Sequence, residues 1–341
     1  METIGILTGG GDAPGLNAVI RACVRRSETY GRRVLGIRKG WKGLLTRDTV
    51  PLDRAAVSGI LHRGGTILGT SRTNPYKKEE DARTLERNFK ELGLDALVAL
   101  GGEDTLGVAA KLAQAGFPVV GVPKTIDNDL SGTDQTFGFD TAVAIATEAI
   151  DRLHSTAESH DRVIVCEVMG RHAGWIALHA GLAGGADYIL VPERPIDVDA
   201  VCAALRRRRE RGKLFSIVVA AEGALLPEGT VTKDAATDAF GHVKLGGIGE
   251  RLASILEERT GFETRSVCLG HVQRGGTPTA FDRVLATRYG LLAAEMVNRR
   301  QFGMMAAWRG GRFEAVPLGD AVKDLRTVPA ATLDEAAAFF G

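Results

Sequence analysis

The chain has 341 residues, of which 44% are hydrophobic and 25% are charged. This composition is ordinary for a folded globular protein and excludes a disordered chain, and the length predicts two domains or one large α/β unit. Lysine and arginine together number 43 against 42 acidic residues, so the formal net charge is only +1. Because proteins that bind nucleic acids or membrane surfaces normally carry a basic face, we expect neither kind of partner.

No apolar run reaches the length of about 18 residues that a transmembrane helix needs, and no signal-peptide pattern follows Met1. The 4 cysteines lie far apart without a C-x-x-C pair, so the sequence suggests neither a zinc knuckle nor a disulfide framework. Two of them occupy apolar, strand-like runs and are predicted to be buried thiols. We therefore expect a cytoplasmic protein whose cysteines stay reduced.

Short apolar segments alternate with amphipathic helices along the chain. Strands are predicted at 3–8, 34–37, 94–100, 119–122, 162–168, 215–221 and 266–270, and helices near 15–30, near 105–115 and through Ile145, Ala149 and Leu153. Continuously apolar strands between helices are typical of a parallel sheet covered on both faces. The sequence therefore predicts an α/β fold with two doubly wound, mostly parallel sheets. A polar loop predicts a domain break near 138–140, and the polar segment 226–247 predicts a surface excursion.

Glycine-rich or acidic turns follow five of the predicted strands, which is where doubly wound folds bind their ligands. The first turn, Gly9–Gly15, precedes a helix, and the backbone N–H groups at a helix start favour an anion. It is not a Walker A loop, because Leu16 follows where lysine is needed, nor a dinucleotide fingerprint, because Pro14 occupies the third glycine position. Its three consecutive glycines indicate close approach of a phosphate; a tight turn with positive φ is the alternative.

The second turn, Gly101–Thr105, places Glu103 and Asp104 between a strand and a helix. Carboxylate oxygens suit a phosphate-bound Mg²⁺, so the turn predicts a metal site. The alternative is that Asp104 or Thr105 simply caps the helix, where an acidic side chain also interacts favourably with the helix dipole.

The third turn, Pro123–Asp129, presents a lysine, a hydroxyl group and two carboxylates spaced i, i+2. Lys124 beside Asp127 and Asp129 predicts a phosphoryl-transfer site, in which one carboxylate is the base and the other lies near the metal. An Asx-type turn without catalytic function is the alternative.

The fourth and fifth turns each place an arginine among glycines: Met169–Gly174 contains Arg171, and Gly270–Gly276 contains Arg274. Arginine recognises phosphate through its planar guanidinium group, although a surface salt bridge would explain either residue alone. Together with Arg162 and Arg265, these two arginines predict a convergent phosphate pocket.

Taken together, the motifs resemble those of the phosphofructokinase family. They occur in the family's order and cover most of the chain: GGGDAPGLNA at 9–18, GGEDT at 101–105, PKTIDND at 123–129, ESHDR at 158–162, EVMGRHAGW at 167–175, AEGA at 221–224, ETR at 263–265 and GHVQRGG at 270–276. The resemblance implies the phosphofructokinase fold and phosphorylation of fructose 6-phosphate at its 1-hydroxyl. It further implies a phosphoryl-donor domain, 1–140 with part of 275–320, and a sugar-phosphate domain, 141–274 with the C-terminal segment.

The resemblance also implies roles for individual residues. Asp127 would be the general base, assisted by Lys124 and Arg171, while Gly11 and Arg72 would bind the donor. Glu103 would hold Mg²⁺, at a position where many members have aspartate. The sugar phosphate would be bound by Thr125, Asp127, Asp129, Arg162, Met169, Gly170, Arg171, Glu222, Arg265, His271 and Arg274. In the family, the residues matching Arg162 and Arg265 come from a neighbouring subunit, which implies a homo-oligomer with shared active sites, expected to be a tetramer.

Two positions distinguish ATP-dependent from pyrophosphate-dependent members of the family. ATP-dependent members usually have glycine at the positions matching Asp104 and Lys124, whereas this sequence has the residues of pyrophosphate-dependent members. Asp104 would put negative charge where the α-phosphate of ATP lies, and two like charges about 4 Å apart cost up to about 4 kcal/mol at an effective dielectric constant of about 20. Lys124 can neutralise the transferred and leaving phosphates. We therefore expect pyrophosphate as the donor and a readily reversible reaction.

Three other functions fit the residues less well. An ATP-dependent kinase of the same fold is disfavoured by Asp104 and Lys124. A non-catalytic sugar-phosphate sensor would have no use for Asp127, Asp129 and Glu103, and a nicotinamide-binding oxidoreductase is disfavoured by the failed dinucleotide pattern.

Allosteric members of the family have a basic effector pocket, which this sequence matches in part. His154 stands where arginine is usual, and a solvated or subunit-facing surface would explain Arg21 and Arg25 equally well. Effector control is left open, and a pyrophosphate user is expected to lack it. The matching residues are Arg21, Arg25, Arg54, Arg211 and Lys213.

Overall fold

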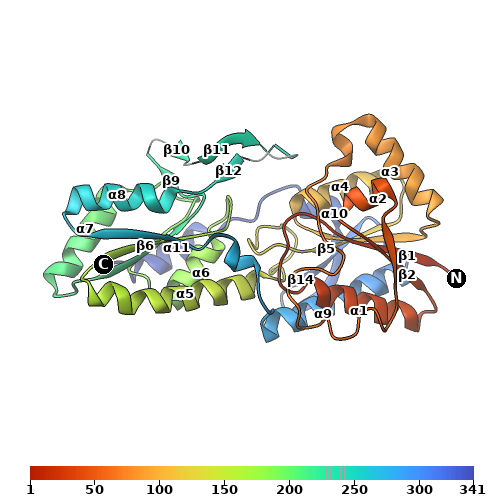
Figure 1. Ribbon diagram of the computed structural model, residues 1–341, viewed down its shortest axis with the longest axis horizontal. Helices are drawn as coiled ribbons and strands as arrows, with labels where there is room; N and C mark the ends of the chain where they lie inside the picture. The colour runs from red at the N-terminus through yellow and green to blue at the C-terminus, as the bar shows by residue number, and fades with distance from the viewer. Residues whose placement is uncertain (228, 231, 238–239, 242) are drawn as a thin grey trace.

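The computed structural model describes residues 1–341 apart from 228, 231, 238–239 and 242, and two sheets with helices on both faces dominate it (Figure 1). The sheet in the right half of Figure 1 has seven described strands in the order β15-β14-β5-β4-β1-β2-β3. Neighbouring strands are parallel except that β3 and β15, at the two edges, are antiparallel. The strands are β1 (Thr3–Thr8), β2 (Arg33–Ile37), β3 (Thr49–Leu52), β4 (Ala96–Gly101), β5 (Val119–Pro123), β14 (Met304–Arg309) and β15 (Arg312–Pro317).

Helices cover both faces of this larger sheet because its strands are apolar on both sides. Ile4 and Ile6 of β1 pack against α1 (Leu16–Thr29) and α9 (Ala280–Asn298), whereas Leu7 packs into the cluster on the opposite face. This is the alternation that a strand buried on both sides requires. The opposite face is covered by α2 (Trp41–Thr46), α3 (Glu79–Glu91), α4 (Glu103–Gln114) and α10 (Leu318–Ala321), with a short 3-10 helix, η1 (Pro75–Lys77), before α3.

The smaller sheet, in the left half of Figure 1, is entirely parallel and has the strand order β13-β6-β8-β7 among the described residues. Its strands are β6 (Val163–Val168), β7 (Tyr188–Leu190), β8 (Ser216–Ala221) and β13 (Thr264–Cys268). One face carries α5 (Phe139–Ser159), α6 (Trp175–Ala183) and α11 (Ala330–Ala337), and the other carries α7 (Val198–Glu210) and α8 (Ile248–Thr260). The predicted surface excursion forms two small antiparallel pairs, β9 (Leu225–Leu226) with β10 (Gly229–Thr230) and β11 (Thr232–Thr237) with β12 (Val243–Leu245).

The chain passes between the two sheets before α5, before α9 and again after α10 (Figure 1). The first two passages are hydrogen bonded to each other. The backbone N–H and the hydroxyl of Thr141 donate to Oδ2 of Asp282 at 2.8 and 2.5 Å, and the Thr279 hydroxyl donates to Asp140 at 2.5 Å. The starts of α5 and α9 therefore cap one another at the position where the sequence predicts a domain break.

The structure confirms the predicted α/β fold with two mostly parallel, helix-covered sheets. All the predicted strands are present with small shifts at their ends, and the sequence does not predict β3, β7, β14 or β15. β7 has only 3 residues, and the partly exposed edge strand β15 lacks a continuous apolar run. One expectation about the cysteines is wrong: Cys166 on β6 is buried, but Cys268 on the edge strand β13 is exposed. In the described part of the chain, no helix is both long and apolar enough to cross a membrane.

We predict that Gly290→Ala lowers the free energy of unfolding by about 1–3 kcal/mol, the usual range for overpacking. Gly290 lies where α9 crosses α1, and an added Cβ would lie 2.5 Å from the Val19 carbonyl oxygen and 2.8 Å from the Ala22 Cβ. Urea unfolding followed by circular dichroism measures the change. Gly107→Ala on α4 is the matched control, because its Cβ would meet nothing within 4 Å. Equal unfolding midpoints for the two variants would contradict the prediction.

Candidate active site

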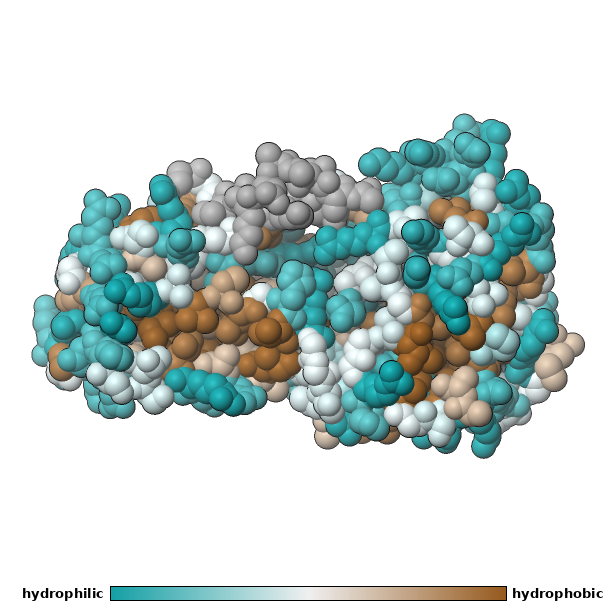
Figure 2. Space-filling view, in the orientation of Figure 1, coloured by the Kyte–Doolittle hydropathy of each residue, from teal (hydrophilic) through white to brown (hydrophobic). Residues whose placement is uncertain are grey.

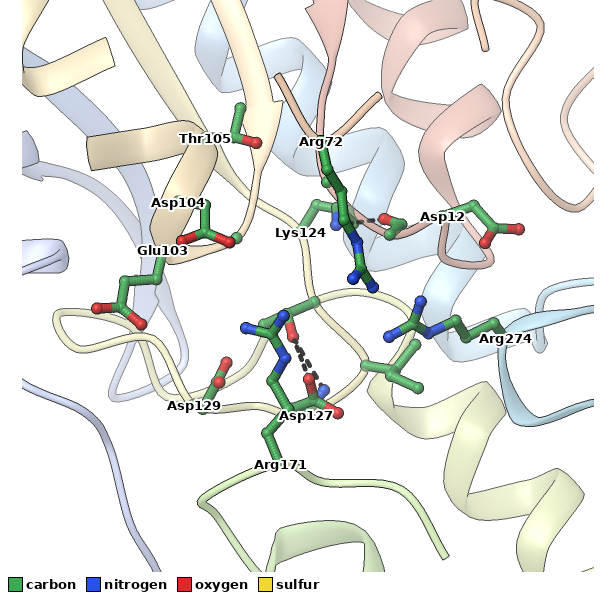
Figure 3. A pocket seen from close by; sticks show the side chains of 15 residues that line it. Asp12, Arg72, Glu103, Asp104, Thr105, Lys124, Asp127, Asp129, Arg171 and Arg274 are labelled. Atoms are coloured by element: carbon green, nitrogen blue, oxygen red, sulfur yellow. Dashed lines mark hydrogen bonds between the residues drawn. The ribbon is translucent and has the colours of Figure 1, made fainter. Parts of the chain in front are cut away.

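A pocket lies between the two sheets, at the carboxyl ends of their strands (Figure 3). In the larger sheet β2 lies on one side of β1 and β4 on the other, so the connections leaving β1 and β4 diverge and leave a crevice. The pocket encloses about 510 Å³, partly open to solvent. The predicted residues that line it are Gly11, Arg72, Glu103, Asp104, Lys124, Thr125, Asp127, Asp129, Arg171 and Arg274; Gly10, Asp12, Gly102, Thr105 and Ile126 line it as well.

Lys124 is a buried cation at the centre of this pocket. It follows β5, its backbone N–H donates to the Gly101 carbonyl at 2.9 Å, and its Nζ donates to the Gly11 carbonyl at 2.5 Å. Its side chain is only 4% exposed. Burial, followed by the neighbouring positive charge of Arg274, lowers the pKa of Lys124 to about 8, while Asp127 acts in the opposite direction. The ammonium group is therefore charged at neutral pH and has little water around it, which strengthens its attraction for a phosphate.

Two glycines of the first two turns, Gly11 and Gly101, lie in close contact with other side chains. A Cβ on Gly11 would lie 2.6 Å from a guanidinium nitrogen of Arg274, which ends the 3-10 helix η2 (Gly270–Arg274) of the other half of the molecule. A Cβ on Gly101 would lie 2.2 Å from the Cβ of Thr105. The GGEDT motif contains this packing signal, although sequence reasoning assigned Thr105 no role beyond helix capping.

Asp127 and Asp129 lie in the loop after β5 and differ in their surroundings. The Asp127 backbone N–H donates to the Thr125 hydroxyl at 3.0 Å, and this hydroxyl lies 3.4 Å from Oδ2 of Asp127. Oδ1 of Asp127 is buried and has no hydrogen-bond partner in the described part of the chain. Burial and the adjacent Asp127 carboxylate raise the pKa of Asp129 to about 7. The loop thus has one carboxylate oxygen without a hydrogen-bond partner in the described part of the chain and a second carboxyl group that a nearby cation would ionise.

The same loop is held in shape by its own polar groups. Asn128 has φ 54, a left-handed conformation that asparagine tolerates better than most residues. Its side-chain oxygen accepts from the Thr136 backbone N–H at 3.0 Å, and the Thr136 hydroxyl donates to the Thr125 carbonyl at 2.7 Å. These bonds close the loop on itself and keep the side chains of Asp127 and Asp129 in a fixed relation.

Arg171 reaches the pocket from the turn after β6, and the residues behind it hold that turn. Its φ is 52, and its backbone N–H donates to Glu222 at 3.2 Å. A Cβ on Gly223 would lie 1.8 Å from the Arg171 carbonyl oxygen, so only glycine fits there. Burial, followed by the charge of Asp127, raises the pKa of Glu222. Glu222 therefore supports Arg171 in this structure and does not line the pocket.

Gln273 joins the fourth and fifth turns, a role that sequence reasoning missed. Its side-chain oxygen accepts from the Met169 backbone N–H at 3.3 Å, and its amide nitrogen donates to the Gly270 carbonyl at 3.0 Å. Gln273 is fully buried at 0% exposure. In the sequence, the one sign of these hydrogen bonds is that a polar residue, Gln273, stands within a glycine-rich motif. That sign does not reveal which residues it bonds to.

Within one chain the structure does not bring Arg162 and Arg265 into the phosphate pocket predicted from the residues. Both pair with Glu263, at 2.7 and 2.6 Å respectively, near the amino ends of β6 and β13. The pocket lies at the carboxyl ends, and a strand of this length spans roughly 20 Å. Predicted residues that do not line the pocket are Arg162, Met169, Gly170, Glu222, Arg265 and His271; of these, Met169 is buried and His271 is exposed.

Glu103 is the carboxylate that could hold a metal at the opening turn of α4. It lines the pocket beside Asp104 (Figure 3). The described residues contain no group of three or more histidine, cysteine or carboxylate side chains placed to hold a metal ion. This arrangement fits Mg²⁺, which typically takes one or two protein carboxylates and receives its other oxygens from substrate phosphates and water.

A buried lysine, arginines and paired carboxylates between two doubly wound sheets define a site suited to phosphoryl transfer, which depends on positioning and charge stabilisation. A family model described as Phosphofructokinase matches residues 3–297, and the chain belongs to the phosphofructokinase family. It is 60% identical over 341 residues to a pyrophosphate–fructose 6-phosphate 1-phosphotransferase of Streptomyces coelicolor, covering 99% of both chains. It is 57% identical over 335 residues to ATP-dependent 6-phosphofructokinase 3 of the same organism, covering 98% of both.

Among solved structures, the chain is similar to Pichia pastoris phosphofructokinase in the T-state, with a TM-score of 0.85 and 34% sequence identity. The similarity covers 99% of this chain and 36% of the Pichia chain, so this protein spans about a third of that longer polypeptide. The expected family and fold are thereby confirmed, and the protein is an enzyme. The relatives named for pyrophosphate and for ATP are almost equally similar, so overall identity does not decide between the two donors.

We predict that anion binding weakens as the pH rises through about 8, because the pKa of Lys124 is lowered to about 8 and its charge is lost above that value. Sulfate is the probe, since its own charge is constant across this range. Its affinity, measured by isothermal titration calorimetry, should decline by up to about tenfold per pH unit above the pKa. Lys124→Met should bind sulfate weakly at every pH. An affinity of the unaltered protein that does not change between pH values below and above 8 would show that Lys124 does not bind the anion.

Proposed function

We propose that this phosphofructokinase transfers a phosphoryl group from pyrophosphate to the 1-hydroxyl of fructose 6-phosphate, producing fructose 1,6-bisphosphate and phosphate in a readily reversible reaction. The observation that supports this donor is the presence of both Asp104 and Lys124 in one pocket. The larger sheet's domain (1–140 with part of 275–320) would bind the donor. The smaller sheet's domain (141–274 with the C-terminal segment) would bind the sugar phosphate.

The donor assignment follows from the charges on the pocket walls. Asp104 lies in the first turn of α4 and lines the pocket, so a nucleotide lying across it would bring its α-phosphate close to a second negative charge. Such repulsion costs up to about 4 kcal/mol at a separation of about 4 Å. Pyrophosphate ends where the α-phosphate would begin and avoids this cost. Its dense charge is matched instead by Lys124 and Arg72.

In the proposed reaction Asp127 is the general base. Its unpartnered Oδ1 accepts the proton of the 1-hydroxyl as the hydroxyl oxygen bonds to the terminal phosphorus of pyrophosphate. The phosphoanhydride bond breaks, and phosphate leaves with the bonding electron pair. Lys124 and Arg171 stabilise the charge that develops on the transferred group and on the leaving phosphate. The Thr125 hydroxyl lies 3.4 Å from the other oxygen, Oδ2, and so restricts rotation of the carboxylate.

Mg²⁺ is part of the proposal through Glu103, with Asp129 as a neighbouring carboxyl. When bound, the ion would neutralise phosphate charge and make the leaving phosphate a better leaving group. Asp129, whose pKa is raised to about 7, would be ionised by a cation placed near it. Both side chains line the pocket, and Figure 3 shows Glu103 and Asp129 on the same side of it.

The sugar-phosphate site is proposed to be completed by a neighbouring subunit in a homo-oligomer, with a tetramer as the expected state. Arg162 and Arg265 lie too far from the pocket of their own chain to reach it. Arg162 immediately precedes β6, and Arg265 lies on β13, the edge strand of the smaller sheet. Figure 2 shows a hydrophobic area on this half of the molecule, at the left of the view. Apolar residues there are only partly buried, which suits a subunit contact. They include Val143, Leu153, Val267 and Leu269.

The donor proposal predicts that kcat/KM is about 1000-fold higher with pyrophosphate than with ATP, the ratio that a 4 kcal/mol repulsion implies. Steady-state assays with each donor, fructose 6-phosphate and Mg²⁺ measure it. The double variant Asp104→Gly, Lys124→Gly should lose pyrophosphate turnover and gain use of ATP. Asp12→Asn is the matched control, because it removes a different acid of the same pocket and should leave the preference unchanged. Robust turnover with ATP and none with pyrophosphate would establish the ATP-dependent alternative.

The shared-site proposal predicts that two inactive variants restore each other. Asp127→Ser should lower kcat by about 100- to 10,000-fold while leaving fructose 6-phosphate binding largely intact. Arg162→Ala should instead weaken sugar-phosphate binding. Co-expressed chains carrying one change each, purified through two different tags, should regain activity, because some sites combine an intact Asp127 with an intact neighbouring Arg162. Mixed oligomers without activity, or a monomer in solution, would disprove shared sites.

A further inference from the structure

A short segment near the end of the chain, residues 324–328, links the two walls of the pocket from behind. We call it the bridging segment. The Ser131 hydroxyl donates to the Asp324 carbonyl at 2.6 Å, and Leu130 forms an isolated β-bridge with Leu325. On its other side, the Val328 backbone N–H donates to Glu193 at 2.8 Å. The bridging segment therefore contacts both the loop after β5 and the part of the molecule that surrounds α6.

Arg326 makes the central contacts of this segment. Its backbone N–H donates to the Asp129 carbonyl at 2.9 Å, and its guanidinium donates to the Asn128 carbonyl at 3.1 Å. The indole N–H of Trp175 donates to the Arg326 carbonyl at 2.9 Å. The guanidinium carbon also lies 4.3 Å from the centre of the Trp175 ring, within the range of a cation–π interaction.

These contacts act on the peptide units that orient the two carboxylates. Asn128 separates Asp127 from Asp129 and has φ 54, and its carbonyl accepts from Arg326, which does not line the pocket. Arg326 supplies that donor with a planar, charged group that is fixed in place by the Trp175 ring. Loss of the guanidinium would leave the Asn128 carbonyl without this bond and would loosen the loop between the two aspartates.

Trp175 connects the same arginine to the opposite wall. It is the first residue of α6 and is 7% exposed, and it lies four positions after Arg171. Its neighbour Gly174 donates its backbone N–H to Glu193 at 2.9 Å, and Glu193 also accepts from the bridging segment. Arg326 thus lies between the loop that carries Asp127 and Asp129, which we call the carboxylate loop, and the base of the turn that carries Arg171.

We propose that Arg326 is a positioning residue for phosphoryl transfer. It does not line the pocket, and it sets the distance between Asp127 and Arg171 by bonding to Asn128 and stacking on Trp175. The inference rests on the proposed roles of Asp127 and Arg171. Because Arg326 does not line the pocket, its loss removes no direct contact with a substrate. The effect is therefore expected mainly in the transferring step, where a small displacement of the reacting groups is costly.

The test compares Arg326→Ala, Arg326→Lys and Trp175→Phe in the full-length enzyme, with whichever donor the unaltered enzyme uses. Arg326→Ala should lower kcat by about 10- to 100-fold, with the KM for fructose 6-phosphate changed by less than about threefold. Added guanidinium chloride at non-denaturing concentration should restore part of kcat. Arg326→Lys should be intermediate, since it keeps the charge without the planar stack. Trp175→Phe keeps a ring but removes the indole donor, and should lower kcat less than Arg326→Ala.

Arg209→Ala is the matched control. Arg209 is also half-buried, and its guanidinium lies 4.4 Å from the Phe262 ring on a part of the molecule remote from the pocket residues. The Arg209→Ala variant should have the kcat of the unaltered enzyme, and added guanidinium chloride should not change that kcat. A kcat of Arg326→Ala within about threefold of the unaltered enzyme, or a loss of activity that only follows loss of folded protein without rescue, would overturn the inference.

Asp127→Ser in the same assays separates this inference from the proposed site. If Asp127→Ser is inactive while both Arg326→Ala and Trp175→Phe keep full kcat, the site stands and the role of Arg326 is disproved. If Asp127→Ser itself keeps full kcat, the proposed site is wrong, and the inference that depends on it falls with it.

Discussion

The arrangement of this molecule around its pocket depends on the burial of one positive charge. Lys124 has almost no contact with water, and its ammonium group is held against the Gly11 carbonyl. A buried charge is costly unless groups of opposite sign lie nearby. Asp127 and Asp129 supply that charge, and burial, followed by the repulsion of Asp127, raises the pKa of Asp129. The site is therefore a set of buried charges of both signs, to which a phosphate and a cation could each bind.

This group of charged side chains comes together only where the two sheets meet. The larger sheet contributes the glycine-rich turns, the acidic turn before α4 and the carboxylate loop, while the smaller sheet contributes Arg171 and Arg274. Reciprocal capping between the starts of α5 and α9 holds the two halves together, and the bridging segment does so again behind the pocket. Each half alone would leave its charged turns facing water.

Much of the fold and of the pocket could be predicted from the sequence, because both depend on local signals. Continuous apolar strands predicted the parallel sheets, and every turn that supplies a charged pocket residue, apart from the segment with Arg72, directly follows a strand. What could not be predicted are bonds between residues far apart in the chain. Gln273 to Met169, Glu222 to Arg171, and Arg326 to Asn128 leave no periodic or compositional trace. Exposure of Cys268 likewise depends on β13 lying at a sheet edge.

By itself, the sequence determined the identity of the charged side chains of the candidate site and their placement after strands, since short-range chemistry decides where a strand ends and a glycine-rich turn begins. Only the tertiary structure decided which of them share a pocket. It brought Arg171 and Arg274 to Lys124, and it left Arg162 and Arg265 at the amino ends of their strands. The physical reason is direction: parallel strands bring whatever follows them to the same end of a sheet, and residues at the opposite end of the strands lie roughly 20 Å from it.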